Sequence, residues 1–207
     1  MVTSPWRIQQ AAATRRQIVL AARRRFAADG YSATTIEAIA AEAGVATATV
    51  YKAFGTKRAM AGALLDLIDD EAGVSRYAVT LATGEDPWAL LQTAVQLDRS
   101  LFEHCGDIIA AVRGAAEVEP EFAGISAEGH RRHTADPTAL ADRLAALGAL
   151  RADIDPTSAA GVIGMYAHHD TFALLTTHYG WTIDQCQERL TAQLCELLLG
   201  ARTPPPT

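Results

Sequence analysis

Apolar residues near the start of the chain recur three and four positions apart, which is the period of a helix that buries one face. One such stripe consists of Ile36, Ile39, Ala40 and Ala43. Thr34, with Glu37 three residues later, has the pattern of a capping box that starts this helix. Gly44 can adopt the left-handed backbone of a sharp corner, and a second short helix then runs from about residue 46 to Gly55. Two short helices joined by such a corner predict a helix-turn-helix.

The same spacing predicts helices along most of the chain. They cover residues 14–30, 57–83, 87–104, 108–116, 121–149 and 156–178, and a last helix starts at residue 182. Pro137 should kink or divide the segment 121–149, because proline lacks an amide hydrogen. Thr182 and Gln185 form a capping box for the last helix. We therefore expect an all-α fold.

The pattern also indicates how the chain is divided. Residues 1–55 are expected to form a three-helix DNA-binding domain, in which residues 1–12 show little periodicity and are a flexible arm. Residues 56–200 are expected to form a larger helical domain. The segment 57–83 is a single helix that links the two domains. Residues 201–207 are a disordered tail.

Charge is distributed unevenly between these parts. The chain has 207 residues and a net charge of −6, which by itself argues against nucleic acid. However, residues 1–60 hold nine Lys and Arg against three Asp and Glu, whereas the remainder holds nine against twenty-one. A basic N-terminal domain attached to an acidic body is typical of a protein that contacts nucleic acid with its N-terminal domain.

Several functional classes find no support in the sequence. No apolar run approaches the roughly 18–20 residues of a membrane span, and the start lacks a signal-peptide hydrophobic region, so we expect a cytoplasmic protein with no membrane partner. Three cysteines without metal-ligand spacing indicate reduced, buried thiols. No nucleophile elbow, phosphate loop or Ser-His-Asp spacing appears, so we expect no catalytic residue and no enzyme. His130 and His133 are too weak a pair to predict a metal, and no cofactor is expected.

The second short helix carries the candidate contact surface. Val50 and Phe54 face inward, which leaves a small, hydroxylic, aromatic and basic set on the outer and flanking sides: Thr47, Ala48, Thr49, Tyr51 and Lys52. After Gly55, Thr56 can cap the next helix, where Lys57 stands in the first turn. Peptide N–H groups and a lysine at a helix N-terminus attract phosphate.

These residues resemble the N-terminal signature of the TetR family of bacterial transcriptional regulators, over about residues 14–64. The resemblance rests on Ala21-Ala22, Phe26, Gly30-Tyr31, Thr34-Thr35, Ile39-Ala40, Ala43-Gly44-Val45, Thr49-Val50-Tyr51, Phe54 and Lys57. Two positions depart from it: Ala46 replaces the usual capping residue, and Arg58 stands where an acidic residue often follows the lysine. The first departure weakens the cap of the second helix by about 1 kcal/mol, unless Thr47 caps it one step later.

The resemblance implies a homodimer that binds an inverted-repeat operator in double-stranded DNA and is released by a small molecule. Thr47, Ala48 and Lys52 would face base edges. Phosphates would be held by Thr34, Thr35, Thr49, Tyr51 and Lys57. The last two helices are the dimerisation candidates, through a seam of Cys186, Leu190, Leu194, Leu197 and Leu198 and through small residues near Gly161. The alternative is that this seam packs within one chain.

The ligand is expected to be mostly apolar and to lie between the linking helix and the helices that follow it. The candidate lining residues are Trp88, Phe102, His104, Met165, His168 and His169. Two alternatives stay open. One is a regulator without a small-molecule ligand, and the other is a helical enzyme or carrier that uses the same pocket.

Overall fold

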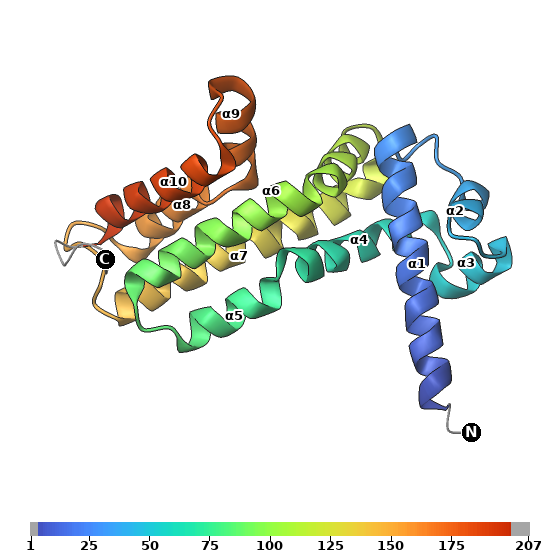
Figure 1. Ribbon diagram of the computed structural model, residues 1–207, viewed down its shortest axis with the longest axis horizontal. Coiled ribbons are helices and arrows are strands. Elements are labelled where there is room, and N and C mark those ends of the chain that lie inside the picture. The colour runs from blue at the N-terminus through green and yellow to red at the C-terminus, as the bar shows by residue number, and fades with distance from the viewer. Residues whose placement is uncertain (1–3, 200–207) are drawn as a thin grey trace. The chain divides into compact units, whose positions relative to one another are not determined.

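The computed structural model describes residues 4–199, apart from the side chains of residues 118, 121 and 133–136. The regular structure of this part is helical, with one isolated bridge between Leu150 and Leu199, which confirms the all-α prediction. The helices are α1 (Pro5–Asp29), α2 (Ile36–Glu42), α3 (Thr47–Phe54), α4 (Lys57–Ala72), α5 (Val74–Thr83), α6 (Pro87–Val118), the short 3₁₀ helix η1 (Pro120–Phe122), α7 (Ala123–Ala146), α8 (Pro156–Tyr166), α9 (His169–Tyr179) and α10 (Ile183–Leu198) (Figure 1). None of these helices is both long enough and apolar enough to span a bilayer.

The chain forms two compact units. The N-terminal unit comprises Met1–Ile68 and Asp107–Gly129, and the C-terminal unit comprises Asp69–Gly106 and His130–Thr207. Helices α4, α6 and α7 each contribute residues to both units. The predicted domain boundary at residue 55 stays a prediction, and the predicted tail 201–207 lies outside the described residues.

The core of the N-terminal unit joins α1, α2 and α3 to parts of α4 and α6. Its large buried side chains include Ile18, Phe26, Ile39, Val50, Met60, Leu64, Ile108 and Phe122. Tyr31, in the turn after α1, packs its ring against Phe26 and Phe122, with centroids 5.1 and 4.0 Å away. Each fully buried side chain of this size contributes about 1.5–3 kcal/mol. This core fixes the positions of α2 and α3.

Helix α2 starts one residue later than its sequence pattern predicts. The Thr35 hydroxyl accepts the amide of Ala38, so Thr35 and not Thr34 is the cap. Thr34 is buried, and its hydroxyl donates to the Gly30 carbonyl at 2.7 Å, which closes the turn after α1. The predicted Thr34–Glu37 box is therefore wrong, because the buried turn uses the first of the two threonines.

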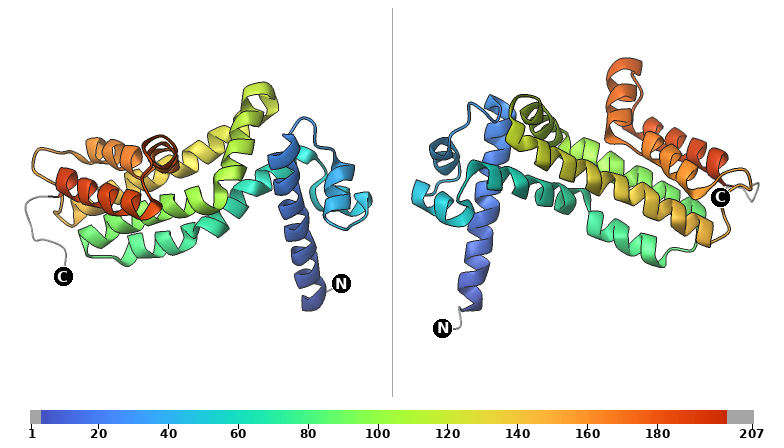
Figure 2. Two further views of the ribbon diagram at one scale, coloured as in Figure 1. Left: turned by 45° about the horizontal axis from the view of Figure 1, so that its top comes forward. Right: turned by 180° about the vertical axis from the view of Figure 1, so that it is seen from behind.

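The predicted flexible arm is helical from Pro5 onward. Pro5 stands in the first turn of α1, where its missing amide hydrogen is not needed. Residues 4–13 are all exposed, and this part of α1 extends away from α2 and α3 (Figure 2). No apolar stripe marks it because nothing packs on it. Its alanine-rich sequence still favours a helix.

Two predicted breaks are absent, and two unpredicted breaks are present. Helix α6 continues through Gly106, where a break was expected, because Cys105 and Ile108 are buried on either side of it. Helix α7 runs through Pro137 without being divided, and the predicted kink at this residue stays a prediction. By contrast, Gly73, with a φ of 80°, separates α4 from α5 within the predicted linking helix. The predicted helix 156–178 is likewise divided between α8 and α9.

Helix α10 begins with both halves of its predicted capping box. Thr182 accepts the amide of Gln185 at 3.1 Å, and the Gln185 side chain accepts the amide of Thr182 at 2.9 Å. Helices α8 and α10 pack side by side in the C-terminal unit (Figure 1). Most of the predicted dimer seam is buried within the chain: Cys186, Leu190, Leu194 and Leu198. Of that seam, Leu197 is exposed.

Candidate nucleic-acid interface

Helix α3 presents the predicted contact residues on its outer side. Val50 is buried, whereas Ala48, Tyr51 and Lys52 are exposed and Thr47 and Thr49 are half-buried. The exposed fraction of Tyr51 is 49%, high for an aromatic side chain. The helix thus offers a hydroxylic, aromatic and basic surface to a partner.

The long helix α1 holds the ends of both short helices. Arg15 donates to the Ala53 carbonyl in the last turn of α3 at 2.6 Å, and its guanidinium lies 3.9 Å from the centre of the Phe54 ring. Gln17 donates to the Ala43 carbonyl at the end of α2 at 2.8 Å. Carbonyls at helix ends have no partner within the helix, so these two side chains both satisfy them and fix the orientation of the pair.

Lys57 contacts the inside of the unit. Its ammonium group donates to the carbonyls of Tyr31 and Thr34 at 2.8 and 2.9 Å, and it lies 4.1 Å from the centre of the Tyr31 ring. These contacts tie the start of α4 to the turn between α1 and α2. Lys57 and the buried Thr34 therefore support the contact surface from behind, while the exposed Thr35 caps α2.

The N-terminus of α3 has no side-chain cap. Ala46 has the extended backbone of a cap residue but no group that could accept a hydrogen bond. The amide of Thr49 instead donates to the Ala46 carbonyl at 2.8 Å. The start of α3 thus has no side-chain acceptor at its cap position, and the helix dipole there favours an anion.

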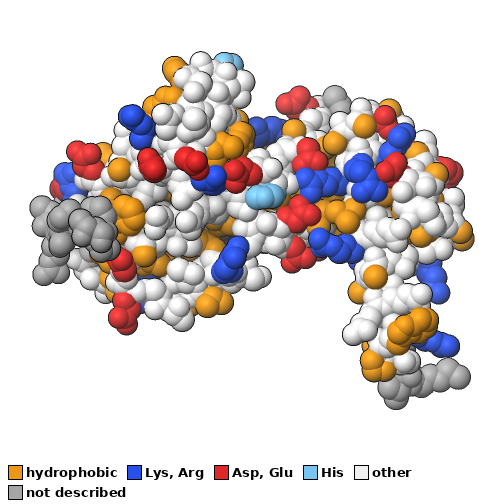
Figure 3. All heavy atoms as spheres, in the orientation of Figure 1, with side chains coloured by type: hydrophobic (Ala, Val, Ile, Leu, Met, Phe, Trp, Pro, Cys, Tyr) orange, Lys and Arg blue, Asp and Glu red, His pale blue; other side chains and the backbone are white. Residues whose placement is uncertain are grey.

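Three arginines of α1 pair with acidic groups nearby. Arg23 makes two hydrogen bonds to Asp107, of 2.8 and 2.6 Å, which hold the pKa of that carboxyl below its usual value. Arg24 pairs with Glu42, and Arg25 with Asp29. Figure 3 shows the blue Lys and Arg side chains of this unit with red acidic ones between them. Among the described residues, Lys52 has no acidic partner.

The sequence of this unit matches a known family. Residues 18–64 fit the sequence model described as "Bacterial regulatory proteins, tetR family". The N-terminal part of the chain is therefore similar to the bacterial regulatory proteins of the TetR family. The match covers α2, α3 and the adjoining parts of α1 and α4, which is the region of the interface described above.

Solved structures with the TetR-regulator fold extend the similarity along the chain. A protein from Mesorhizobium loti described as a TetR-family transcriptional regulator has a TM-score of 0.70 and 20% identity, and the match covers 90% of this chain and 96% of that one. A transcriptional regulator from Saccharomonospora viridis in complex with choline has a TM-score of 0.67 and 20% identity, and the match covers 91% of this chain and 99% of that one. The SmeT–triclosan complex has a TM-score of 0.72 and 18% identity, and the match covers 94% of this chain and 100% of that one. At these identities the likeness shows the fold. No significant match to a curated protein was found.

Of the six predicted ligand residues, Trp88 lines a hollow of the C-terminal unit. The other residues that line this hollow are Gln92, Gln187, Glu188 and Thr191. Phe102 is half-buried and stacks on Phe172. His104 and Met165 are exposed. The His168 ring accepts the amide of Asp170 and so caps α9, and His169 stacks on it with centroids 4.4 Å apart. These two imidazoles and the Asp170 carboxylate have ligand atoms within 4.8 Å of one another, but capping α9 already engages the Nδ1 atom of His168.

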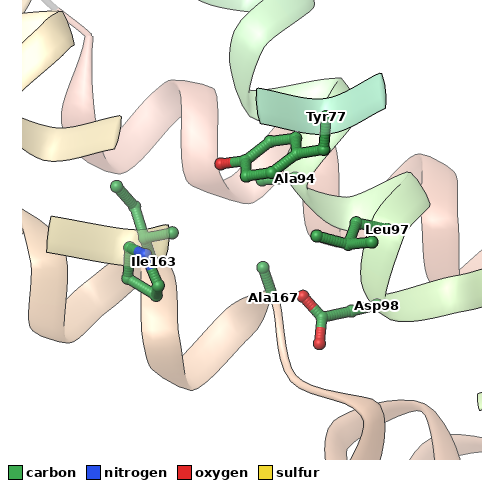
Figure 4. Close-up of a pocket in the computed structure, with 7 residues that line it drawn as sticks. Tyr77, Ala94, Leu97, Asp98, Ile163 and Ala167 are labelled. Atoms are coloured by element: carbon green, nitrogen blue, oxygen red, sulfur yellow. The ribbon is translucent and has the colours of Figure 1, made fainter. Parts of the chain in front are cut away.

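A second hollow lies between α5, α6, α7 and α8 (Figure 4). Its lining residues are Tyr77, Ala94, Leu97, Asp98, Pro137, Ile163 and Ala167. Asp98 is only 5% exposed, although carboxylates are seldom buried in this way. The free volume is about 10 Å³, which is room for about one water molecule.

Sequence reasoning missed four residues of these sites: Arg15, Gln17, Tyr77 and Asp98. Arg15 and Gln17 lie among the many polar residues of α1, and nothing in the sequence says which carbonyl they reach. Asp98 does carry a signal, because it interrupts the apolar positions Leu97 and Leu101 on α6. The three thiols are free, and Cys105 and Cys186 are buried as expected. Cys195 is only half-buried, and desolvation raises the pKa of its thiol to about 12.

Proposed function

We propose that the protein is a homodimeric repressor that acts in the cytoplasm. It binds an inverted-repeat operator in double-stranded DNA and leaves it when a small, mostly apolar molecule binds the C-terminal unit. The observation that carries DNA binding is the outer surface of α3, which is held in place from α1 and begins without a side-chain cap.

The proposed division of roles within the interface follows exposure. Thr47, Ala48 and Lys52 contact base edges in the major groove. Thr35, Thr49 and Tyr51 contact phosphates, together with the first amides of α3. Thr34 and Lys57 are left out of the direct contacts because their polar groups are engaged inside the unit. Their role is to position the two short helices.

Dimerisation is proposed to use the exposed side of α8 and α10. Met165 on α8 is 61% exposed and Leu197 on α10 is 37% exposed, and Gly161 lies one turn before Met165 on the exposed side of α8. Apolar and small side chains on neighbouring helices allow a second copy to approach closely. A two-fold dimer would present two copies of α3 to the two halves of an inverted repeat.

Ligand control is supported by the similar structures that hold choline and triclosan. A ligand weakens DNA binding only by its differential affinity for the two states of the dimer, typically about 1–3 kcal/mol. Helices α4, α6 and α7 have residues in both units, so a shift of any of them in the C-terminal unit also acts on the N-terminal unit.

A pair of tyrosine substitutions tests the interface. Duplexes bound by the wild type are first selected from a random pool, and their affinity is measured by fluorescence anisotropy. Tyr51→Ala should weaken binding about tenfold or more, because each subunit loses a contact. Tyr179→Ala, which removes an even more exposed ring at the end of α9, should leave the affinity unchanged.

The outcomes separate the proposal from its rivals. Equal effects of the two substitutions, or no selected duplex at all, would remove DNA binding by α3 and favour the enzyme or carrier. Specific DNA binding that no compound of a broad thermal-shift screen alters would favour the regulator without a small-molecule ligand.

A further inference from the structure

A hollow of the C-terminal unit lies between the start of α6 and the middle of α10. Arg99 of α6 donates to the side chains of Asp184 and Gln187 on α10 at 2.7 and 2.8 Å, so the two helices are tied together beside this hollow. The free volume is about 240 Å³, just below the about 300–1,000 Å³ of typical small-molecule sites. The hollow therefore has room for a small molecule. It is lined from α6 by Trp88 and Gln92 and from α10 by Gln187, Glu188 and Thr191.

Thr191 brings a buried hydroxyl to this lining. The residue is 2% exposed, and its hydroxyl has no hydrogen-bond partner among the described residues. Four other threonines in helices of this unit donate to the carbonyl four residues earlier: Thr80, Thr83, Thr93 and Thr176. A buried hydroxyl without a partner destabilises the folded chain, and a polar atom of a bound molecule would satisfy it.

The lining also combines one flat apolar side chain with amide groups. Trp88 is half-buried, and a ring that stacks on an indole gains more than the burial of apolar area alone provides. The carboxamide of Gln92 carries a donor and an acceptor next to each other. Gln187 already accepts from Arg99 through its carbonyl oxygen, which leaves its NH₂ group as a donor. A ligand that matches this lining is aromatic and has a polar edge.

The charge of the lining argues against an acidic ligand. Glu188 is exposed at the hollow, and its carboxylate repels a second anion. None of the five described lining residues is basic. A neutral polar edge meets this condition, and it also has to match both groups of the Gln92 carboxamide. A cyclic amide does so, because its ring holds the N–H and C=O on the same side, where they can form two parallel hydrogen bonds with a carboxamide.

We propose that this hollow binds a planar aromatic molecule with a cyclic amide in its ring, and that Trp88, Gln92 and Thr191 select it. The inference rests on the proposed ligand control and specifies its ligand class. Trp88 stacks on the aromatic ring, and Gln92 pairs with the N–H and C=O of the amide. The Thr191 hydroxyl donates to the same carbonyl.

The test compares three probes of the same bicyclic skeleton, using the full chain and isothermal titration calorimetry. Quinolin-2-one has both the aromatic ring and the cyclic amide. It should bind about tenfold more tightly than 1-methylquinolin-2-one, which lacks the N–H donor, and about tenfold more tightly than octahydroquinolin-2-one, which keeps the amide without the flat ring. If either analogue binds as tightly as quinolin-2-one, or if quinolin-2-one does not bind at millimolar concentration, the proposal is wrong.

A pair of threonine variants tests the buried hydroxyl. Thr191→Val keeps the shape of the side chain and should lower the affinity for quinolin-2-one about fivefold or more. Without ligand, the same variant should unfold at a higher urea concentration than the wild type, because an unpaired polar group is removed from the interior. Thr176→Val makes the same change where the hydroxyl donates to the Phe172 carbonyl, and it should show neither effect. Equal behaviour of the two variants would overturn the role of Thr191.

A pair of glutamine variants separates hydrogen bonding from steric fit. Gln92→Met keeps the length of the side chain but removes the amide, so quinolin-2-one and 1-methylquinolin-2-one should bind this variant about equally. Gln96→Met, at an exposed position one turn later on α6, should keep the wild-type preference. A folded Gln92→Met protein that still prefers quinolin-2-one as strongly as the wild type would place the amide elsewhere and overturn the assignment.

Operator binding is measured separately, so that the two proposals can fail separately. Quinolin-2-one that binds through Gln92 and Thr191 without altering operator affinity would leave the site in place and remove ligand control through it. Release of the operator by another compound, with no quinolin-2-one binding, would keep the proposed function and remove the cyclic-amide site.

Discussion

Lys52 and Lys57 carry the same charge five residues apart, yet their surroundings give them different roles. Lys52 is exposed on α3, whereas Lys57 donates to two backbone carbonyls and lies over the Tyr31 ring. A charged donor that satisfies buried carbonyls contributes to folding. A solvated lysine on a contact surface contributes instead to the binding of an anion.

Substitution of the two lysines should separate stability from DNA binding. Lys57→Met, which keeps the aliphatic stem, should lower the free energy of unfolding by about 1–3 kcal/mol, because two carbonyls lose their donor. Lys52→Ala should leave stability within about 0.5 kcal/mol of the wild type and weaken DNA binding. Urea unfolding gives the first quantity. If Lys52 also reaches a phosphate, the slope of log affinity against log salt should fall by about one unit per lost contact.

The reverse pattern would contradict these roles. A Lys57→Met protein of full stability that had lost salt dependence would return Lys57 to the DNA surface, as the sequence pattern first suggested.

At the scale of the element, α3 is short and begins without a side-chain cap. Eight residues are too few for a helix to be stable alone, so α3 depends on Val50 in the core and on Arg15 at its end. An uncapped start weakens the folded helix but leaves amides for a phosphate. We interpret Ala46 as a position where stability was not maximised.

A new cap should therefore stabilise the protein. Ala46→Ser places a hydroxyl where it can accept an amide of the first turn, and it should raise the free energy of unfolding by about 1 kcal/mol. Ala12→Ser makes the same chemical change within the exposed part of α1 and should be neutral or slightly destabilising. Chemical denaturation of the two variants in parallel provides the comparison. No gain for Ala46→Ser over Ala12→Ser would show that the start of α3 is already satisfied in solution.

At the scale of the whole molecule, the proposed function requires two copies. One α3 can contact only one half of an inverted repeat, and pairing of two copies multiplies both affinity and specificity. The apolar and small residues left exposed on α8 and α10 are the best candidates for this contact.

Dimerisation can be tested with a pair of charge insertions. Met165→Arg on α8 should produce a monomer and abolish tight operator binding, because an arginine would be buried against the partner. Val79→Arg, at a similarly exposed apolar position of α5, should leave the dimer intact. Light scattering gives the oligomeric state, and a footprint on the selected operator should show two half-sites about one helical turn apart, or slightly more. A wild type that is monomeric at micromolar concentration would exclude this arrangement.

The sequence by itself predicted the all-α fold, the helix-turn-helix and its family, because these depend on local patterns. The helical period, the glycine at the corner and the Thr182–Gln185 box act within a few residues of one another, and the structure confirms each of them. Helix ends were predicted less well. At Gly106 the packing of neighbours outweighed a local breaker, and in the exposed start of α1 a helix formed without any buried stripe.

Only the tertiary structure decided which side chains serve the surface and which serve the core. Thr34 and Thr35 are adjacent, and the sequence cannot say that the first is buried and the second caps α2. Lys57, Arg15 and Asp98 depend on partners or walls many residues away, so their roles follow from how the helices pack. Local periodicity determines that a helix forms, whereas the direction and surroundings of each polar group are set by contacts between segments distant in sequence.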